Sequence, residues 1–183
     1  MSRLARLVSV IALAGLFAAV PVLRTAAQDG TPAAGSSGAM SVVETQSVID
    51  AYLAALVAQE DIAPFFSEDI VLELVDVGQE IRGRDAVAGT IVGWQQQAFD
   101  AHPEITHLIV SEGTAAAEAV FIGTHTGEFA GIPATGREVA VPYAVFYELA
   151  DGEITILRIH GFATGLVAAL TAEATPAAET PAP

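Results

Sequence analysis

Residues 138–162 read EVAVPYAVFYELADGEITILRIHGF, and this stretch decides the fold of the chain. Both halves are rich in β-branched and aromatic residues, which favour β-strands. Between them, Asp151 and Gly152 form the two-residue turn signal of a tight β-hairpin. The stretch therefore predicts two long antiparallel strands, over residues 138–149 and 153–162.

The remaining elements place helices before most of the strands. Apolar residues near helical spacing predict a helix over 44–58, and a second long helix is expected over 84–102. Strand-like runs occupy residues 69–77, 105–111 and 116–126. Helices first and a meander of long strands afterwards predict an α+β domain, in which N-terminal helices cover one face of a curved antiparallel sheet.

The composition limits the number of domains and the kinds of partner. A chain of 183 residues with 52% hydrophobic content can bury one sizeable core, so we expect one folded domain. The formal net charge of -15 would repel nucleic acid and anionic lipid headgroups, which are therefore poor candidate partners. There is no Cys, which removes disulfides, thiolate nucleophiles and Cys-ligated zinc.

The N-terminal segment has the pattern of a secretory signal. Arg3 and Arg6 form a positive head, an apolar run follows over 7–23, and small residues at 25–27 suit cleavage. An uncleaved membrane anchor is the alternative, because Arg24 could act as a stop. We expect cleavage, and therefore a secreted or cell-surface protein with no membrane contact beyond the signal segment.

The flanks of the domain differ from it in composition. Residues 28–43 are rich in Gly, Ser, Pro and Ala, and residues 171–183 are rich in Pro, Ala and Glu. Such segments bury too little apolar surface to offset their ordering entropy. We therefore predict a signal peptide over 1–27, a flexible linker over 28–43, one domain over 44–170 and a disordered tail over 171–183.

Several local strings carry a resemblance to a known family. They are VGQEIRGRDAV (77–87), Trp94 in the second long helix, GTHTGEFAGIPATGREV (123–139), DGEI (151–154) and RIHGFATGLVAAL (158–170). Over about residues 44–170, the chain resembles the SnoaL-like polyketide cyclase and ester cyclase family of the nuclear transport factor 2-like superfamily. The resemblance implies a cone-shaped fold, with a curved antiparallel sheet wrapped around N-terminal helices and a deep, mostly apolar pocket. It also implies a homodimer formed through the outer face of the sheet.

The resemblance further implies ring closure by intramolecular aldol chemistry, with an acidic side chain as acid and base and no metal or organic cofactor. In the relatives this acid is an Asp at the end of the last strand, in a pattern like R-x-Y-W-D. Counted back from GLVAAL, the corresponding position here is Phe162, with His160 and Gly161 at the two aromatic positions. The acid that the family uses for proton transfer is therefore absent.

Two histidines are candidates for the missing proton-transfer group. His160 would share a strand face with Phe162, because residues two apart in a strand point the same way, and an imidazole suits a base at neutral pH. It could equally fill the space of the family's Tyr without catalysing anything. His125 would be a second base or an orienting donor if it faces the pocket, or a surface or dimer-interface residue if it faces outward.

The remaining candidates are substrate-binding residues. Arg158 could bind an anionic substrate group or pair with an acid, and Glu73 points either to solvent or into the pocket as a buried acid. The pocket walls are assigned to aromatic residues, namely Phe162, Trp94, Tyr52 and Tyr143. A metal site is not expected, because no H-x-H or H-E-x-x-H spacing is present.

These residues favour an exported domain that binds a small hydrophobic carbonyl compound in an apolar pocket and catalyses a cyclase- or isomerase-type proton transfer without a cofactor. The alternative is a non-catalytic ligand-binding or assembly domain that has lost the family's catalytic Asp, with Phe162 in its place.

Overall fold

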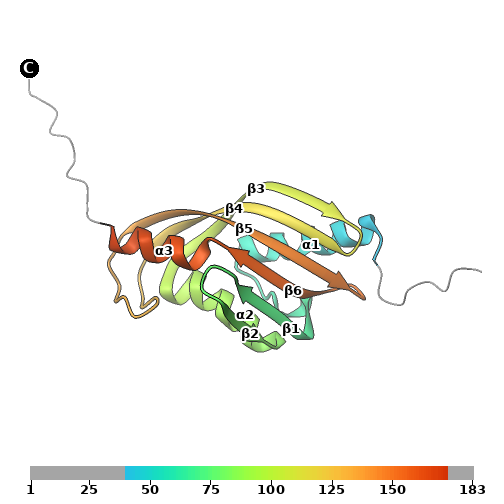
Figure 1. Ribbon diagram of the computed structural model, residues 1–183, viewed down its shortest axis with the longest axis horizontal. Helices are drawn as coiled ribbons and strands as arrows, with labels where there is room; N and C mark the ends of the chain where they lie inside the picture. Colours follow the sequence, from blue (N-terminus) through green and yellow to red (C-terminus); the bar gives the residue numbers. More distant parts are fainter. Residues whose placement is uncertain (1–39, 173–183) are drawn as a thin grey trace, which may run out of the picture. The chain divides into compact units, whose positions relative to one another are not determined.

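The computed structural model describes residues 40–172, and predictions for residues 1–39 and 173–183 lie outside this range. Within it, six strands form one curved sheet in the order β2-β1-β6-β5-β4-β3 (Figure 1). The strands are β1 (Phe66–Leu74), β2 (Gln79–Arg82), β3 (Phe99–Ser111), β4 (Thr114–His125), β5 (Glu138–Ala150) and β6 (Glu153–His160). The predicted α+β fold is confirmed. The sheet is mixed rather than purely antiparallel, because β1 and β6 pair in parallel.

The first helix, α1 (Val42–Ala58), begins at a capping box. The Ser41 hydroxyl oxygen accepts from the Glu44 backbone N–H, and the Glu44 carboxylate accepts from the Ser41 N–H at 2.9 Å. This arrangement satisfies two donors that a helix start otherwise leaves free. The helix buries Ile49, Tyr52 and Leu56, whereas Val57 at its end is 45% exposed.

The second predicted helix is wrong at its C-terminal end. Instead of running to residue 102, α2 (Arg84–Val92) passes into a π-helical segment, η2 (Gly93–Ala98), and β3 begins at Phe99. Residues 99–102 alternate buried and exposed and pair with β4. Pro103 lies within β3, and an edge strand tolerates a proline.

The hairpin that closes the domain forms as predicted, but its second strand is shorter. Asp151 and Gly152 both have positive φ, at 52° and 84°, as a type I′ turn requires. β6 ends at His160, Gly161 takes a φ of 78°, and Phe162 opens a third helix, α3 (Phe162–Thr171). The prediction that the strand reaches Phe162 is therefore wrong.

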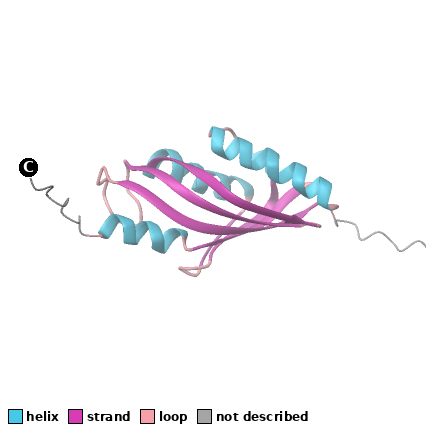
Figure 2. Ribbon diagram, turned by 90° about the horizontal axis from the view of Figure 1, so that it is seen from above, coloured by secondary structure: helices cyan, strands magenta, loops and turns pink. Residues whose placement is uncertain are grey.

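Alternation along the strands gives the sheet an inner and an outer face. Helices α1 and α2 lie along one face (Figure 2), and the buried side chains of β4 and β5 form the inner face, such as Phe121 and Tyr147. On the outer face, Phe146 is 48% exposed. In residues 40–172, no helix is both long and apolar enough to cross a membrane.

Candidate functional site

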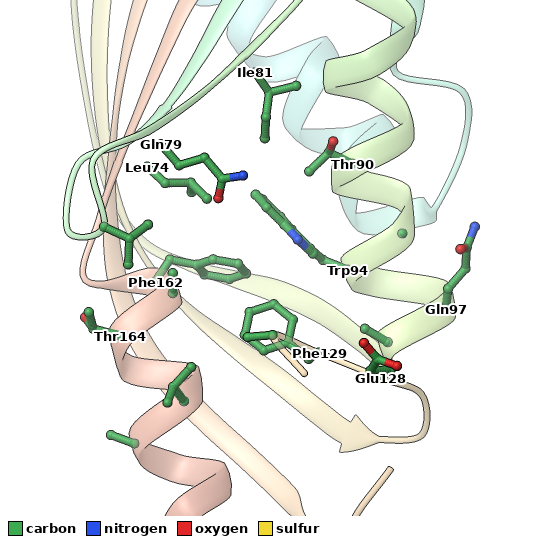
Figure 3. Close-up of a pocket in the computed structure, with 17 residues that line it drawn as sticks. Leu74, Gln79, Ile81, Thr90, Trp94, Gln97, Glu128, Phe129, Phe162 and Thr164 are labelled. Carbon is green, nitrogen blue, oxygen red and sulfur yellow. The ribbon is translucent and has the colours of Figure 1, made fainter. Parts of the chain in front are cut away.

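A cleft of about 1060 Å³ opens between the α2–η2 segment, β2 and α3 (Figure 3). Its walls are mostly apolar, and the loop after β4 contributes Phe129. Among the described residues that line it, Glu128 is the one ionisable side chain. The neutral polar side chains of the lining are Gln79, Thr90, Gln97 and Thr164. This volume and lining suit a small organic molecule.

A second, smaller cavity of about 40 Å³ adjoins the cleft, inside the cone. It is lined by α1, α2, η2, the first residue of α3 and the inner faces of β4, β5 and β6. Besides Trp94, its lining residues with a polar side-chain group are Tyr52 from α1, Gln95 from η2, and Tyr143 and Tyr147 from β5. Within the described part of the chain, the side chains of these four residues make no hydrogen bond to another residue. The space can hold a group about the size of one water molecule.

Trp94 and Phe162 line both the cleft and the inner cavity. The two rings project toward each other from η2 and from the start of α3 (Figure 3), with centroids 4.9 Å apart and planes inclined by 45°. Phe162 also packs edge-on against Phe121 and Tyr143, at 5.2 Å from each. The Trp94–Phe162 pair therefore forms the partition between the two spaces.

Burial keeps the three tyrosines of the inner cavity protonated. It raises the pKa of Tyr52, Tyr143 and Tyr147 above the ordinary value of a phenol, and neighbouring phenol groups add to this effect for Tyr52 and Tyr147. Desolvation disfavours the charged phenolate. All three hydroxyls are therefore neutral groups that can donate a hydrogen bond at any physiological pH.

His125 faces inward but lines neither space. It is fully buried beside Phe99, with ring centroids 4.9 Å apart. Its Nδ1 accepts from the Thr135 backbone N–H at 3.2 Å and lies 3.0 Å from the Thr135 hydroxyl. The proton of the neutral ring therefore belongs on Nε2, which is buried and has no partner among the described residues. The contact with Thr135 fixes the loop that carries Glu128 and Phe129 to the cleft.

The structure does not bring His160 into the cleft or the inner cavity. It is exposed on the outer face, with its ring edge-on to Phe146 at 5.4 Å. The inference that His160 shares a face with Phe162 is wrong, because the strand alternation stops at Gly161. Phe162 is 2% exposed and points inward from α3.

Arg158 and Glu73 also lie outside both spaces and pair with each other. Arg158 donates from Nε to Glu73 at 3.0 Å and from Nη1 to Glu148 at 2.5 Å, across three neighbouring strands. The hydrogen bond with Glu148 is the main reason why the pKa of Arg158 is raised. All three side chains are partly exposed, so the network adds little to stability.

Gln95 lines the inner cavity and Glu128 lines the cleft, and neither is among the site residues predicted from the sequence. For Glu128, the preceding Gly127 is a feature of the sequence that could have indicated this loop. A Cβ at Gly127 would lie 2.0 Å from the Gln97 carbonyl oxygen, so glycine is required where this loop crosses η2. No comparable signal exists for Gln95. None of the His, Asp and Glu side chains within residues 40–172 are grouped as a metal site would need.

The curved, open sheet with helices on its inner face and a cavity between them defines the α+β cone fold of the nuclear transport factor 2-like superfamily. The family model of the SnoaL-like polyketide cyclases matches residues 46–160, and the chain belongs to this family. No curated protein matches the chain.

Solved structures agree with this fold. A proposed SnoaL-like polyketide cyclase from Jannaschia sp. CCS1 has a TM-score of 0.64 at 16% identity, covering 72% of this chain and 94% of its own. A proposed polyketide cyclase from Xanthomonas campestris pv. campestris has a TM-score of 0.60 at 19% identity, with coverages of 71% and 98%. A proposed ketosteroid isomerase from Kribbella flavida has a TM-score of 0.53 at 19% identity, with coverages of 78% and 84%.

Proposed function

We propose that the domain binds a small, neutral, hydrophobic carbonyl compound, with its rings in the cleft. The observation that carries this proposal is the apolar cleft with neutral phenol hydroxyls directly behind it. The apolar walls favour rings or chains without charge, because burying an unpaired charge there would be costly. The structural neighbours include proteins described as a polyketide cyclase and a ketosteroid isomerase, and both names point to carbonyl compounds.

The residues that line the inner cavity favour ligand binding without catalysis. The resemblance puts the family's acid at position 162, where this chain has a Phe that packs into the partition. Among the described residues that line the inner cavity there is no carboxylate and no imidazole. Proton abstraction next to a carbonyl needs such a base within hydrogen-bond reach.

Binding is tested by titrating the protein with 1-tetralone, a two-ring ketone, and following the indole N–H signal of Trp94 by NMR. The chain has a single Trp, so the signal is unambiguous. Ala168→Phe should narrow the cleft and weaken binding roughly tenfold, which is about 1.4 kcal/mol. Ala54→Phe is the control, because both alanines are exposed helical positions and only Ala168 lines the cleft. The absence of any shift up to the solubility limit would contradict the proposal.

A second candidate is a cyclase- or isomerase-type proton transfer, and one observation favours it. Glu128 places a carboxylate on the apolar cleft, where a carbonyl compound would lie. The test is the rate at which the protein exchanges the protons next to the 1-tetralone carbonyl for deuterium. Catalysis by Glu128 requires an accelerated exchange that Glu128→Gln abolishes and that Glu112→Gln, on the exposed turn between β3 and β4, leaves unchanged.

Three expectations remain predictions from the sequence and its resemblance. They are export through the N-terminal segment, a homodimer formed through the outer face of the sheet, and the absence of a nucleic-acid partner.

A further inference from the structure

We infer that the inner cavity is an oxygen-binding subsite, in which the buried tyrosines donate hydrogen bonds to the carbonyl oxygen of the ligand. This inference rests on the proposed function, because it names the group by which a ligand of the cleft is recognised. The chain has three tyrosines, and all three line this cavity. They converge from α1 and β5, which are far apart in the sequence.

The donors belong to largely buried side chains and have no hydrogen-bond partner among the described residues. Tyr52 and Tyr147 are each 3% exposed, and Gln95 is 5% exposed. Their side chains make no hydrogen bond to any other described residue. The rings of Tyr52 and Tyr147 lie 6.0 Å apart at 69°, so their positions are fixed by packing. In the described residues, the fully enclosed polar atoms without a partner are Asp76 Oδ1 and His125 Nε2, so the groups of the cavity lining remain accessible to a small molecule. A ligand oxygen in the cavity would accept hydrogen bonds from them.

The charge of the cavity selects a neutral oxygen. Its described lining has no Arg or His, so a carboxylate or phosphate would be buried without a counter-ion. The formal net charge of -15 adds a long-range repulsion of anions. The three hydroxyls are neutral because burial raises the pKa of each. A ketone, ester or quinone oxygen, which accepts hydrogen bonds and carries no charge, fits these donors.

The size of the cavity fixes which part of the ligand reaches it. A volume of about 40 Å³ can admit one oxygen atom but no ring. The rings then remain in the cleft of about 1060 Å³. The carbonyl reaches the inner cavity at the Trp94–Phe162 pair, whose rings are in contact at 4.9 Å and must move apart to admit it. Recognition by the subsite therefore requires a carbonyl that projects from the edge of a ring system.

The experiment compares 1-tetralone with tetralin, which has the same two rings and no oxygen. Dissociation constants are measured by the Trp94 NMR titration for the wild type, Tyr143→Phe and Tyr52→Phe. Thr106→Val is the control, because it removes an exposed hydroxyl on β3 that lines neither the cleft nor the inner cavity. We expect the wild type to prefer tetralone, and each Tyr→Phe change to weaken tetralone about fivefold to tenfold without changing tetralin affinity.

The outcomes separate the two proposals. Equal affinity of the wild type for both compounds, or equal weakening of both by Tyr→Phe, would overturn the oxygen subsite and leave the apolar binding function intact. If neither compound binds, both proposals are overturned. If one Tyr→Phe variant does not fold, as judged by circular dichroism, the other provides the same comparison at a different position of the cavity.

Discussion

Replacing Phe162 with Ala should lower the free energy of unfolding by about 3 kcal/mol and merge the cleft with the inner cavity. The side chain is 2% exposed, and its ring packs on Trp94, Phe121 and Tyr143 at centroid distances of 4.9, 5.2 and 5.2 Å. Loss of a buried Phe side chain costs about 3–5 kcal/mol. We expect the low end, because the ring already borders two empty spaces and loses fewer contacts on those sides.

The assay is urea unfolding followed by circular dichroism, combined with titration of the folded variant. Phe129→Ala is the matched control, since this Phe lines the cleft, is 9% exposed and packs on Phe99 at 5.4 Å, but does not border the inner cavity. Both variants should lose stability, and Phe162→Ala alone should bind the larger ketone anthrone more tightly than the wild type. A loss below about 1 kcal/mol for Phe162→Ala would refute its packed position. The same anthrone affinity in both variants would refute its role as the partition.

Three further predictions follow from single positions. Gly127→Ala should lower the free energy of unfolding by about 3 kcal/mol or more, because its Cβ would lie 2.0 Å from the Gln97 carbonyl oxygen and backbone atoms cannot move aside freely. Gly136→Ala is the control in the same urea assay. Gly136 has a φ of 68° and open space around it, so this change should cost about 1 kcal/mol. Asp76→Ala should cost about 1 kcal/mol at pH 7 by removing the cap of α3. Burial pushes the pKa of Asp76 up, but hydrogen bonds from the Thr164 backbone N–H and hydroxyl outweigh it and lower the pKa, so the difference from wild type should shrink as the pH falls below about 4. His160→Ala should change stability by less than about 0.5 kcal/mol and leave tetralone affinity unchanged, because the side chain is exposed on the outer face; a tenfold loss of affinity would show that His160 reaches the ligand.

Local signals in the sequence were sufficient for the hairpin and the first helix. The turn at Asp151 and Gly152 needs positive φ at both positions, and the residue types alone indicate this. The helix over 44–58 was predicted by apolar spacing, and its capping box at Ser41 is also a local pattern. Features of this kind depend on neighbours within a few residues, and a single sequence contains them in full.

The errors arise where a local pattern competes with a contact from elsewhere in the chain. Residues 99–102 continue a plausible helical sequence, but Phe99 pairs with His125 across the sheet. Phe162 continues an apparent strand, but the positive φ of Gly161 ends the alternation and starts α3. This second error also misplaced the candidate site, because it assigned His160 and Phe162 to the same face of the sheet. Likewise, Tyr52 and Tyr147 meet only through the packing of α1 on the sheet, which no spacing in the sequence reveals.

Phe162 lines the inner cavity at the position where the resemblance implies an acid. An acid at this position would stand at the N-terminus of α3, where the helix dipole favours a carboxylate, and beside the hydroxyl-bearing Tyr143. In our proposal the tyrosine hydroxyls polarise a bound carbonyl, while no carboxylate or imidazole is present among the described residues of the inner cavity to take a proton. Donors alone stabilise a bound carbonyl, whereas enolisation also needs a base. We therefore propose that the cavity holds a ketone without enolising it. Among the described residues that line the cleft, only Glu128 has a side chain that could act as a base. The deuterium exchange of 1-tetralone by wild type and Glu128→Gln thus decides whether this member of the family is a binding domain or an enzyme with a relocated base.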